Sequence, residues 1–203
     1  MVAAKSQRSA QEYDIVAAVR RTWPSGVVSP ALGNDSPAAA RQLNDQARQA
    51  FLTHRDPVEA FDLQLRAFGA NPRDAEVAGN LAFLYLKLSP PQPEISRQVV
   101  LHAMALNSVQ LHTTRADDWL TFAVANALIG RQDDATNALY VTIALTQDLE
   151  RSCKAALGAM TGYGERLKQP VQAMMARIHS QGRDYESPFC SWPPRGNIAR
   201  TYF

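Results

Sequence analysis

Cysteine and histidine are the side chains in this chain with the widest chemical repertoire, as nucleophiles and as metal ligands. Cys153 and Cys190 stand far apart, and the sequence contains neither CxxC nor HxxxH spacing. Structural zinc sites need four such ligands, usually at short spacings, so we expect no metal and no cofactor. Each histidine is alone in its segment; the four are His54, His102, His112 and His179.

Catalytic motifs are also missing from the sequence. We find no GxSxG, P-loop, dinucleotide-binding or metalloprotease pattern. A Cys–His nucleophile would require convergence in space that no motif signals. The acidic pairs Asp117-Asp118 and Asp133-Asp134 open expected helices, where negative charge complements the helix dipole. We therefore expect a protein that binds and does not catalyse a reaction.

The two cysteines leave two interpretations open. In the first, Cys153 is a buried thiol and Cys190 a thiol of the tail, as free cysteines are commonly buried. In the second, they form a disulfide, which would indicate an oxidising compartment. A bias toward Ala, Gln and Arg over Lys favours a bacterial source. We expect the bacterial cytoplasm, or the periplasm if the cysteines are paired.

Composition indicates a folded, soluble chain. Hydrophobic residues make up 46% of the 203 residues, which is enough for a core, and the formal net charge is +2. No segment is strongly basic, so nucleic acid is not an expected partner. No apolar run reaches membrane-spanning length, so we expect no direct membrane insertion.

Three parts follow one another along the chain. Residues 1–36 contain a helix over 9–23 and a linker over 24–36 that is rich in Pro, Gly and Ser. Residues 37–180 form a helical domain, and 181–203 form a tail without helical periodicity. Ser36-Pro37 and Asp56-Pro57 are helix starts, with a capping side chain before a proline. Further helices are expected over 74–88, 94–107, 116–129, 133–145, 148–161 and 165–180.

These short antiparallel helices recur at about 34 residues, a period typical of stacked helix pairs. The stretch from Ala116 carries the pattern best, through Trp119, Phe122, Ala123, Gly130, Ala135 and Leu139. The stretch from Ala75 supplies Leu81, Ala82, Tyr85, Ser96, Val100, Ala103 and Leu106. The preceding stretch supplies Phe51, Ala60, Ala67 and Pro72, although Arg48 stands where a small residue is usual.

This pattern resembles that of tetratricopeptide repeats. The resemblance implies an all-α fold of antiparallel helix pairs stacked as a short solenoid, with an accessory N-terminal helix and an irregular tail. The alternative is a helical bundle without repeats. The resemblance also implies a concave groove lined by the first helix of each pair, at Asn80, Phe83, Leu86, Lys87, Leu120, Thr121, Val124 and Leu128.

The implied function is that of an adaptor or scaffold, in which the groove binds a partner protein or peptide. The alternative is an assembly subunit, which includes a homo-oligomer, or a regulatory domain whose groove is covered by a neighbour or by its own chain. The tail is a candidate for that cover, or a docking segment itself, through Phe189, Trp192, Tyr202 and Phe203.

Overall fold

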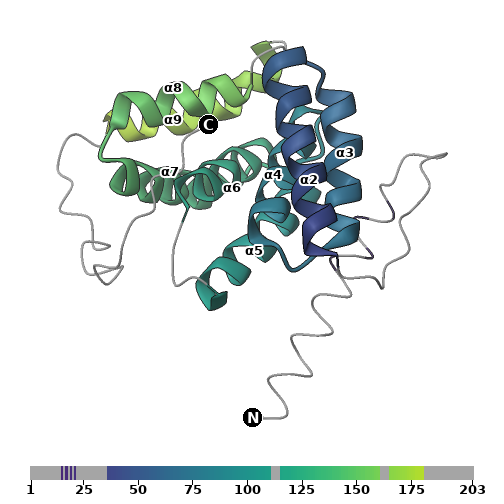
Figure 1. The fold of residues 1–203 in the computed structure, drawn as a ribbon. Coiled ribbons are helices and arrows are strands. Elements are labelled where there is room, and N and C mark those ends of the chain that lie inside the picture. Colours follow the sequence, from purple (N-terminus) through teal and green to yellow (C-terminus); the bar gives the residue numbers. More distant parts are fainter. Residues whose placement is uncertain are drawn as a thin grey trace. The chain divides into compact units, whose positions relative to one another are not determined.

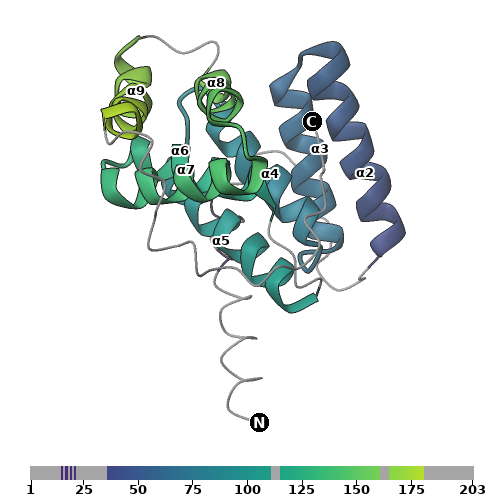
Figure 2. The same cartoon turned by 90° about the vertical axis from the view of Figure 1, so that its left-hand side faces the viewer.

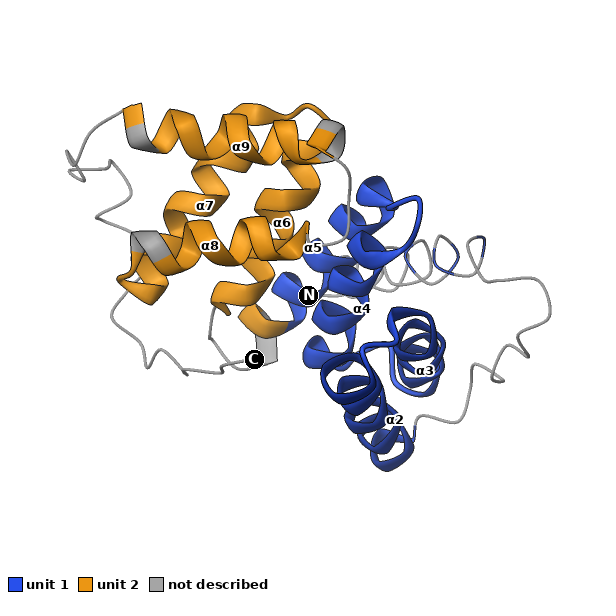
Figure 3. Cartoon of the chain, turned by 90° about the horizontal axis from the view of Figure 1, so that it is seen from above, with its two compact units in different colours: residues 1–106 blue, residues 107–203 orange. Residues whose placement is uncertain are grey.

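The computed structural model describes residues 15, 17, 19, 21, 36–110, 115–160 and 165–180 (Figure 1). Over these residues the fold is helical and contains no strand, which confirms the all-α class. The chain forms two compact units, residues 1–106 and 107–203 (Figure 3). The predicted repeat domain therefore spans both units, while the linker over 24–35 and the tail over 181–203 lie outside the described residues.

The first unit is built on α2 (Pro37–Gln49), η1 (Ala50–His54), α3 (Pro57–Ala70), α4 (Ala75–Lys87) and most of α5 (Pro93–Gln110). Both predicted helix starts are confirmed. Ser36 Oγ accepts a hydrogen bond from the Ala39 amide at 3.4 Å. Asp56 Oδ1 accepts from the amides of Val58 and Glu59, both at 3.0 Å. These side chains satisfy amides that the first helical turn leaves without a partner.

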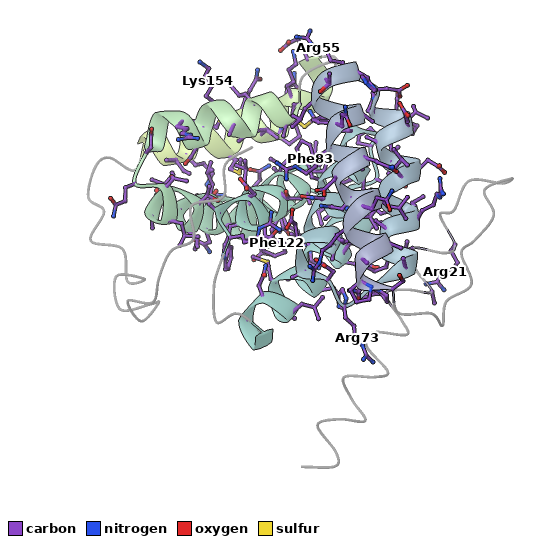
Figure 4. The ribbon with its side chains drawn as sticks, in the orientation of Figure 1. Arg21, Arg55, Arg73, Phe83, Phe122 and Lys154 are labelled. Atoms are coloured by element: carbon purple, nitrogen blue, oxygen red, sulfur yellow. The ribbon has the colours of Figure 1, made fainter. Side chains whose placement is uncertain are left out.

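Neighbouring helices of this unit are antiparallel. The Ser36 amide at the start of α2 donates to the Ala70 carbonyl at the end of α3, at 3.2 Å. Figures 1 and 2 show α2 and α3 side by side, and Figure 4 places Arg55 and Arg73 at opposite ends of α3. Ser96 Oγ in α5 donates to the Ala82 carbonyl of α4 at 2.8 Å. The described helices thus pack in neighbouring pairs.

Two contacts fix the relation of the second helix pair to the first. Phe61 in α3 meets Tyr85 in α4 edge to face, with ring centroids 5.0 Å apart. Phe68 near the end of α3 meets His102 of α5, whose Nε2 lies 2.8 Å from the Pro72 carbonyl. Phe68 and Tyr85 are fully buried. The core of the unit therefore lies along α3, between the two pairs.

The second unit contains α6 (Ala116–Leu128), α7 (Gln132–Thr146), α8 (Leu149–Ala159) and α9 (Glu165–Ser180). Gly130, with φ at 82°, turns the chain between α6 and α7. Within this unit α6 contacts α7, α8 and α9. Figures 2 and 3 show α8 and α9 crossing over α6 and α7. This arrangement differs from a regular stack, in which a following pair would run alongside the preceding one.

Side chains at the start of α7 hold α9. Gln132 Nε2 donates to the Pro170 carbonyl at 3.2 Å, and Arg177 pairs with Asp133 at 2.7 Å. Pro170 lies in the second turn of α9, as the sequence predicts.

Of the expected N-terminal helix, the described residues 15, 17, 19 and 21 are helical, and Val19 is buried. Among the described helices, none is long and apolar enough to cross a bilayer.

Candidate binding site

The eight predicted groove residues fall into a buried set and a half-buried set. Leu86 and Val124 are fully buried, and Asn80 and Thr121 are 7% and 6% exposed. A groove-bound peptide needs side chains that it can touch, so the structure does not support a groove lining made of these four. The half-buried set is Phe83, Lys87, Leu120 and Leu128.

Two of the half-buried residues belong to one cluster in the first unit. The Phe83 ring of α4, labelled in Figure 4, meets the Phe51 ring of η1 edge to face, with centroids 5.6 Å apart. Lys87 Nζ lies over the Phe83 ring, 5.3 Å from its centroid. Phe51 is half-buried, as Phe83 and Lys87 are, and the neighbouring Leu52 is 52% exposed. We call Phe51, Phe83 and Lys87 the aromatic–lysine patch.

A π-helical turn positions Phe51. Ala50–His54 form η1 at the end of α2, and Arg55 closes it in the left-handed conformation, with φ at 56°. A π-helical turn holds one more residue than an α-helical turn, so it changes the direction of the side chains that follow. Such turns are rare and frequently occur at functional sites. The unusual backbone and the partly exposed aromatic pair thus coincide.

Lys87 carries the charge of the patch. Burial lowers the pKa of the Lys87 amine from 10.5 to about 8. Its position over the Phe83 ring favours the charged form, because the face of an aromatic ring attracts cations. At neutral pH the patch therefore combines apolar ring surface with a partly desolvated cation. That combination can bind an apolar side chain that has a carboxylate beside it.

The half-buried leucines of α6 belong to the second unit, whereas the aromatic–lysine patch belongs to the first. Thr121 and Val124 are buried because α6 is the central helix of its unit, and every residue from 123 to 127 is buried as well. Leu120 and Leu128 lie within the second unit and remain predictions as binding residues. The same helix carries an edge-to-face ring pair of its own, Trp119 and Phe122, whose centroids lie 6.2 Å apart.

A polar cluster stands at the start of α6. Asn107 Nδ2 donates to the buried Asp118 carboxylate at 2.8 Å, and Arg115 Nη1 lies 3.9 Å from the other oxygen. Burial raises the pKa of the neighbouring Asp117 carboxyl, while the charges of Arg115 and Arg151 lower it. The sequence explained both acids by the helix dipole alone. The structure adds a partly buried network of opposite charges, which we interpret as structural.

Of the two cysteines, Cys153 is among the described residues. Cys153 is a buried, free thiol, and burial raises the pKa of that thiol. Cys153 thus fits the buried-thiol interpretation, while the alternative of a disulfide involves Cys190 and stays a prediction. Cys190 and the tail residues Phe189, Trp192, Tyr202 and Phe203 lie outside the described residues. Their role as a cover or a docking segment stays a prediction.

Sequence reasoning missed Phe51 and Leu52 as site residues. The sequence did carry a signal, because Ala40, Asn44, Ala47 and Phe51 recur at helical spacing, and the structure buries the first three. Among the described residues, no group of three or more His, Cys, Asp or Glu side chains is placed to hold a metal ion. Comparison with protein-family models, curated proteins and solved structures found no match to this chain.

Proposed function

We propose that this chain is a protein–protein interaction module that binds a partner segment at the aromatic–lysine patch. The observation that carries the proposal is the edge-to-face pair of Phe51 and Phe83, both half-buried, with the Lys87 cation over the Phe83 ring. Aromatic side chains dominate the binding energy of protein interfaces, so a partly exposed pair is costly unless a partner covers it. A binding role without catalysis stays the prediction for this chain.

The helix arrangement of the first unit supports a binding role of the kind that stacked helix repeats have. Contacts of α2 with α4, and of α3 with α5, join equivalent helices of consecutive antiparallel pairs. This is the connectivity expected for stacked helix pairs such as tetratricopeptide repeats. In that family the first helices of the pairs line the binding groove. The patch lies on α4 and at the end of α2, which are the first helices here.

The partner we propose is a peptide segment with an aromatic or aliphatic side chain next to an acidic residue. The test is selection of peptides from a displayed random library on the full chain, followed by titration of the enriched peptides. We expect them to pair an apolar residue with Asp or Glu, and to bind Phe83→Ala about tenfold or more weakly, as truncation of a central anchor does.

The matched control is Leu101→Ala, which truncates another exposed apolar side chain of the first unit, on α5. This variant should bind the selected peptides as the unaltered chain does. Lys87→Gln should weaken peptides that carry an acidic residue and leave neutral versions of them unaffected. Peptides that bind Phe83→Ala and the unaltered chain equally well would overturn the proposal.

A second candidate function is assembly of the chain into a homo-oligomer. The observation that favours it is a pair of exposed apolar side chains near the turn from α2 to α3, Leu52 at 52% and Val58 at 71% exposure. Sedimentation of the unaltered chain and of Val58→Asp separates the two functions. A stable oligomer that Val58→Asp dissociates supports assembly, and a monomer that binds the selected peptides supports the adaptor.

A further inference from the structure

Three buried side-chain amides connect the first three helices of the first unit. Asn44 of α2, Gln64 of α3 and Asn80 of α4 are 5%, 0% and 7% exposed. Gln64 Nε2 and Asn80 Nδ2 both donate to Asn44 Oδ1, each at 2.9 Å. Gln64 Nε2 also donates to the Val77 carbonyl at 2.9 Å. We call Asn44, Gln64 and Asn80 the amide triad.

Stability alone does not explain the triad. Gln64 Oε1 is buried and has no hydrogen-bond partner, and leaving a buried acceptor unpaired costs stability. Rotating the amide by half a turn would not help, because it would place that oxygen against Asn44 Oδ1 and the Val77 carbonyl, which are acceptors themselves. Apolar side chains of similar volume would fill the same space without this cost.

The triad provides directional hydrogen bonds, which fix how the helices are aligned along their axes. Burial of apolar surface is not directional, so it resists sliding of one helix along another only weakly. A slip of α2 by one turn, about 5.4 Å, would break both hydrogen bonds to Asn44 Oδ1. Buried polar side chains that select one register over others are the best-attested use of such networks. The triad thus distinguishes one alignment of α2 and α4 from its neighbours.

That alignment is the one that assembles the aromatic–lysine patch. Asn44 Nδ2 donates to Glu76 Oε1 of α4 at 3.4 Å. Phe51 follows Asn44 by two turns, and Phe83 follows Glu76 by two turns. The contact of Asn44 with Glu76 and the contact of Phe51 with Phe83 therefore share one register. A shifted α2 would separate the two rings.

We propose that the amide triad positions the aromatic–lysine patch, by holding α2 and α4 in the register that brings the Phe51 ring to Phe83. Gln64 is then a positioning residue: it is fully buried on α3, and it acts on the patch only through Asn44 and α4. The proposal rests on the docking role of the patch for its biological meaning, but its central test needs no partner.

The test uses Gln64→Met, which keeps the length of the side chain and removes both hydrogen bonds together with the unpaired oxygen. The readout is the nuclear Overhauser effect between the Phe51 and Phe83 rings, measured in the full chain with labelled phenylalanine. We expect this signal to be lost in Gln64→Met while the melting temperature stays at or above that of the unaltered chain. A purely structural role would lower the melting temperature and leave the signal of the folded fraction in place.

The matched control is Gln132→Met in the second unit. Gln132 also donates through Nε2 to a backbone carbonyl, that of Pro170, and its Oε1 is also buried without a partner. Its replacement should leave the Phe51–Phe83 signal unchanged. Asn80→Leu, which removes the other hydrogen bond to Asn44 Oδ1, should lose the signal as Gln64→Met does.

Retention of the inter-ring signal in both Gln64→Met and Asn80→Leu would overturn the proposal. Failure of both variants to fold would overturn it too, since the triad would then support the whole unit and not one register. Loss of the inter-ring signal with unchanged binding of the selected peptides would distinguish the two proposals. It would establish the positioning role of the triad and refute the patch as the docking site.

Discussion

Replacing Asp118 by alanine tests how strongly burial governs the charge pairs of the second unit. The Asp118 side chain is 3% exposed and that of Arg115 is 14% exposed. Alanine would leave the Arg115 guanidinium and the Asn107 amide without the carboxylate that both now face. Removing one partner of a buried ion pair costs about 3–5 kcal/mol, so we expect the free energy of unfolding to fall by that amount.

The comparison is Asp133→Ala in the same unit. The Asp133–Arg177 pair is shorter, at 2.7 Å against 3.9 Å, but its side chains are 85% and 41% exposed. Water screens such a pair, and its loss should cost about 0–1 kcal/mol. The longer pair is therefore expected to matter more. Asp118→Asn should lie between the two, because an amide oxygen can still accept from Asn107.

Urea unfolding followed by far-ultraviolet circular dichroism and by tryptophan fluorescence measures all three variants. Trp119 neighbours Asp118 on α6, and replacing Trp23 and Trp192 by phenylalanine in the parent chain makes the fluorescence report on this helix. Equal losses for Asp118→Ala and Asp133→Ala would refute the reasoning, since burial would then not decide the effect. A larger loss for Asp133→Ala would mean that the separation of the charges outweighs their exposure.

The remaining predictions concern two glycines, Lys87 and Cys153. Gly130→Ala should destabilise the chain by about 1–2 kcal/mol, since alanine is strained at a φ of 82° even where nothing crowds its Cβ. Gly158 is exposed in α8, and Gly158→Ala should stabilise the chain by about 0.5–1 kcal/mol, because glycine is less favourable than alanine inside a helix. Urea midpoints of the two variants that shift in the same direction would contradict these two expectations. The Lys87 amine has a pKa of about 8 in the folded chain and 10.5 in the unfolded chain. Between pH 8 and 10.5 the unfolded chain therefore binds more protons than the folded chain, and the free energy of unfolding of the unaltered chain should rise over this range. Lys87→Met should accordingly be the more stable chain at pH 7 and lose that advantage by pH 10.5; a difference that does not vary with pH in urea titrations would count against the burial of the amine. Cys153 should react with iodoacetamide more slowly in the folded chain than in urea, because burial both covers the thiol and raises its pKa, and equal rates by mass spectrometry would contradict this.

Helix positions could be predicted because their ends are marked locally. Ser36 and Asp56 cap the helices that they were expected to start, and Gly130 turns the chain where the pattern breaks. Capping and turn preferences act over a few residues, so the sequence alone displays them. The expected helix over 133–145, for example, runs from Gln132 to Thr146.

The π-helical turn was not predicted, and it explains a misfit in the pattern. Arg48 stands where the repeat resemblance requires a small residue, and the structure leaves Arg48 exposed while it buries Ala47, one position earlier. The turn that follows contains one residue more than an α-helical turn. The phase of α2 is thus offset by one residue from that of the helices after it. A period count along the sequence cannot show where such an extra residue lies.

The candidate site was only partly predictable, because exposure depends on which helices pack around a residue. Phe83 and Lys87 were expected to face a partner, and they are half-buried beside Phe51. The repeat resemblance also placed Thr121 and Val124 in the groove, but both are buried on the central helix of their unit. The amide triad was not predicted, although Asn44 lies on the same face of α2 as Ala40 and Ala47. A polar side chain on that face was the available signal.

The enclosure of α6 has a consequence for how this gene can vary. None of the residues from 116 to 128 is exposed, whereas α2 exposes most of its positions and buries only Ala40, Asn44 and Ala47. Codons for α2 therefore include many at which a new polar residue is neutral, and the sensitive ones recur once per helical turn. Codons for α6 have no exposed side, because each of its positions is buried or half-buried. A saturation mutagenesis map of this chain would show a periodic stripe along α2 and, along α6, a denser pattern of intolerance that is continuous over residues 123–127.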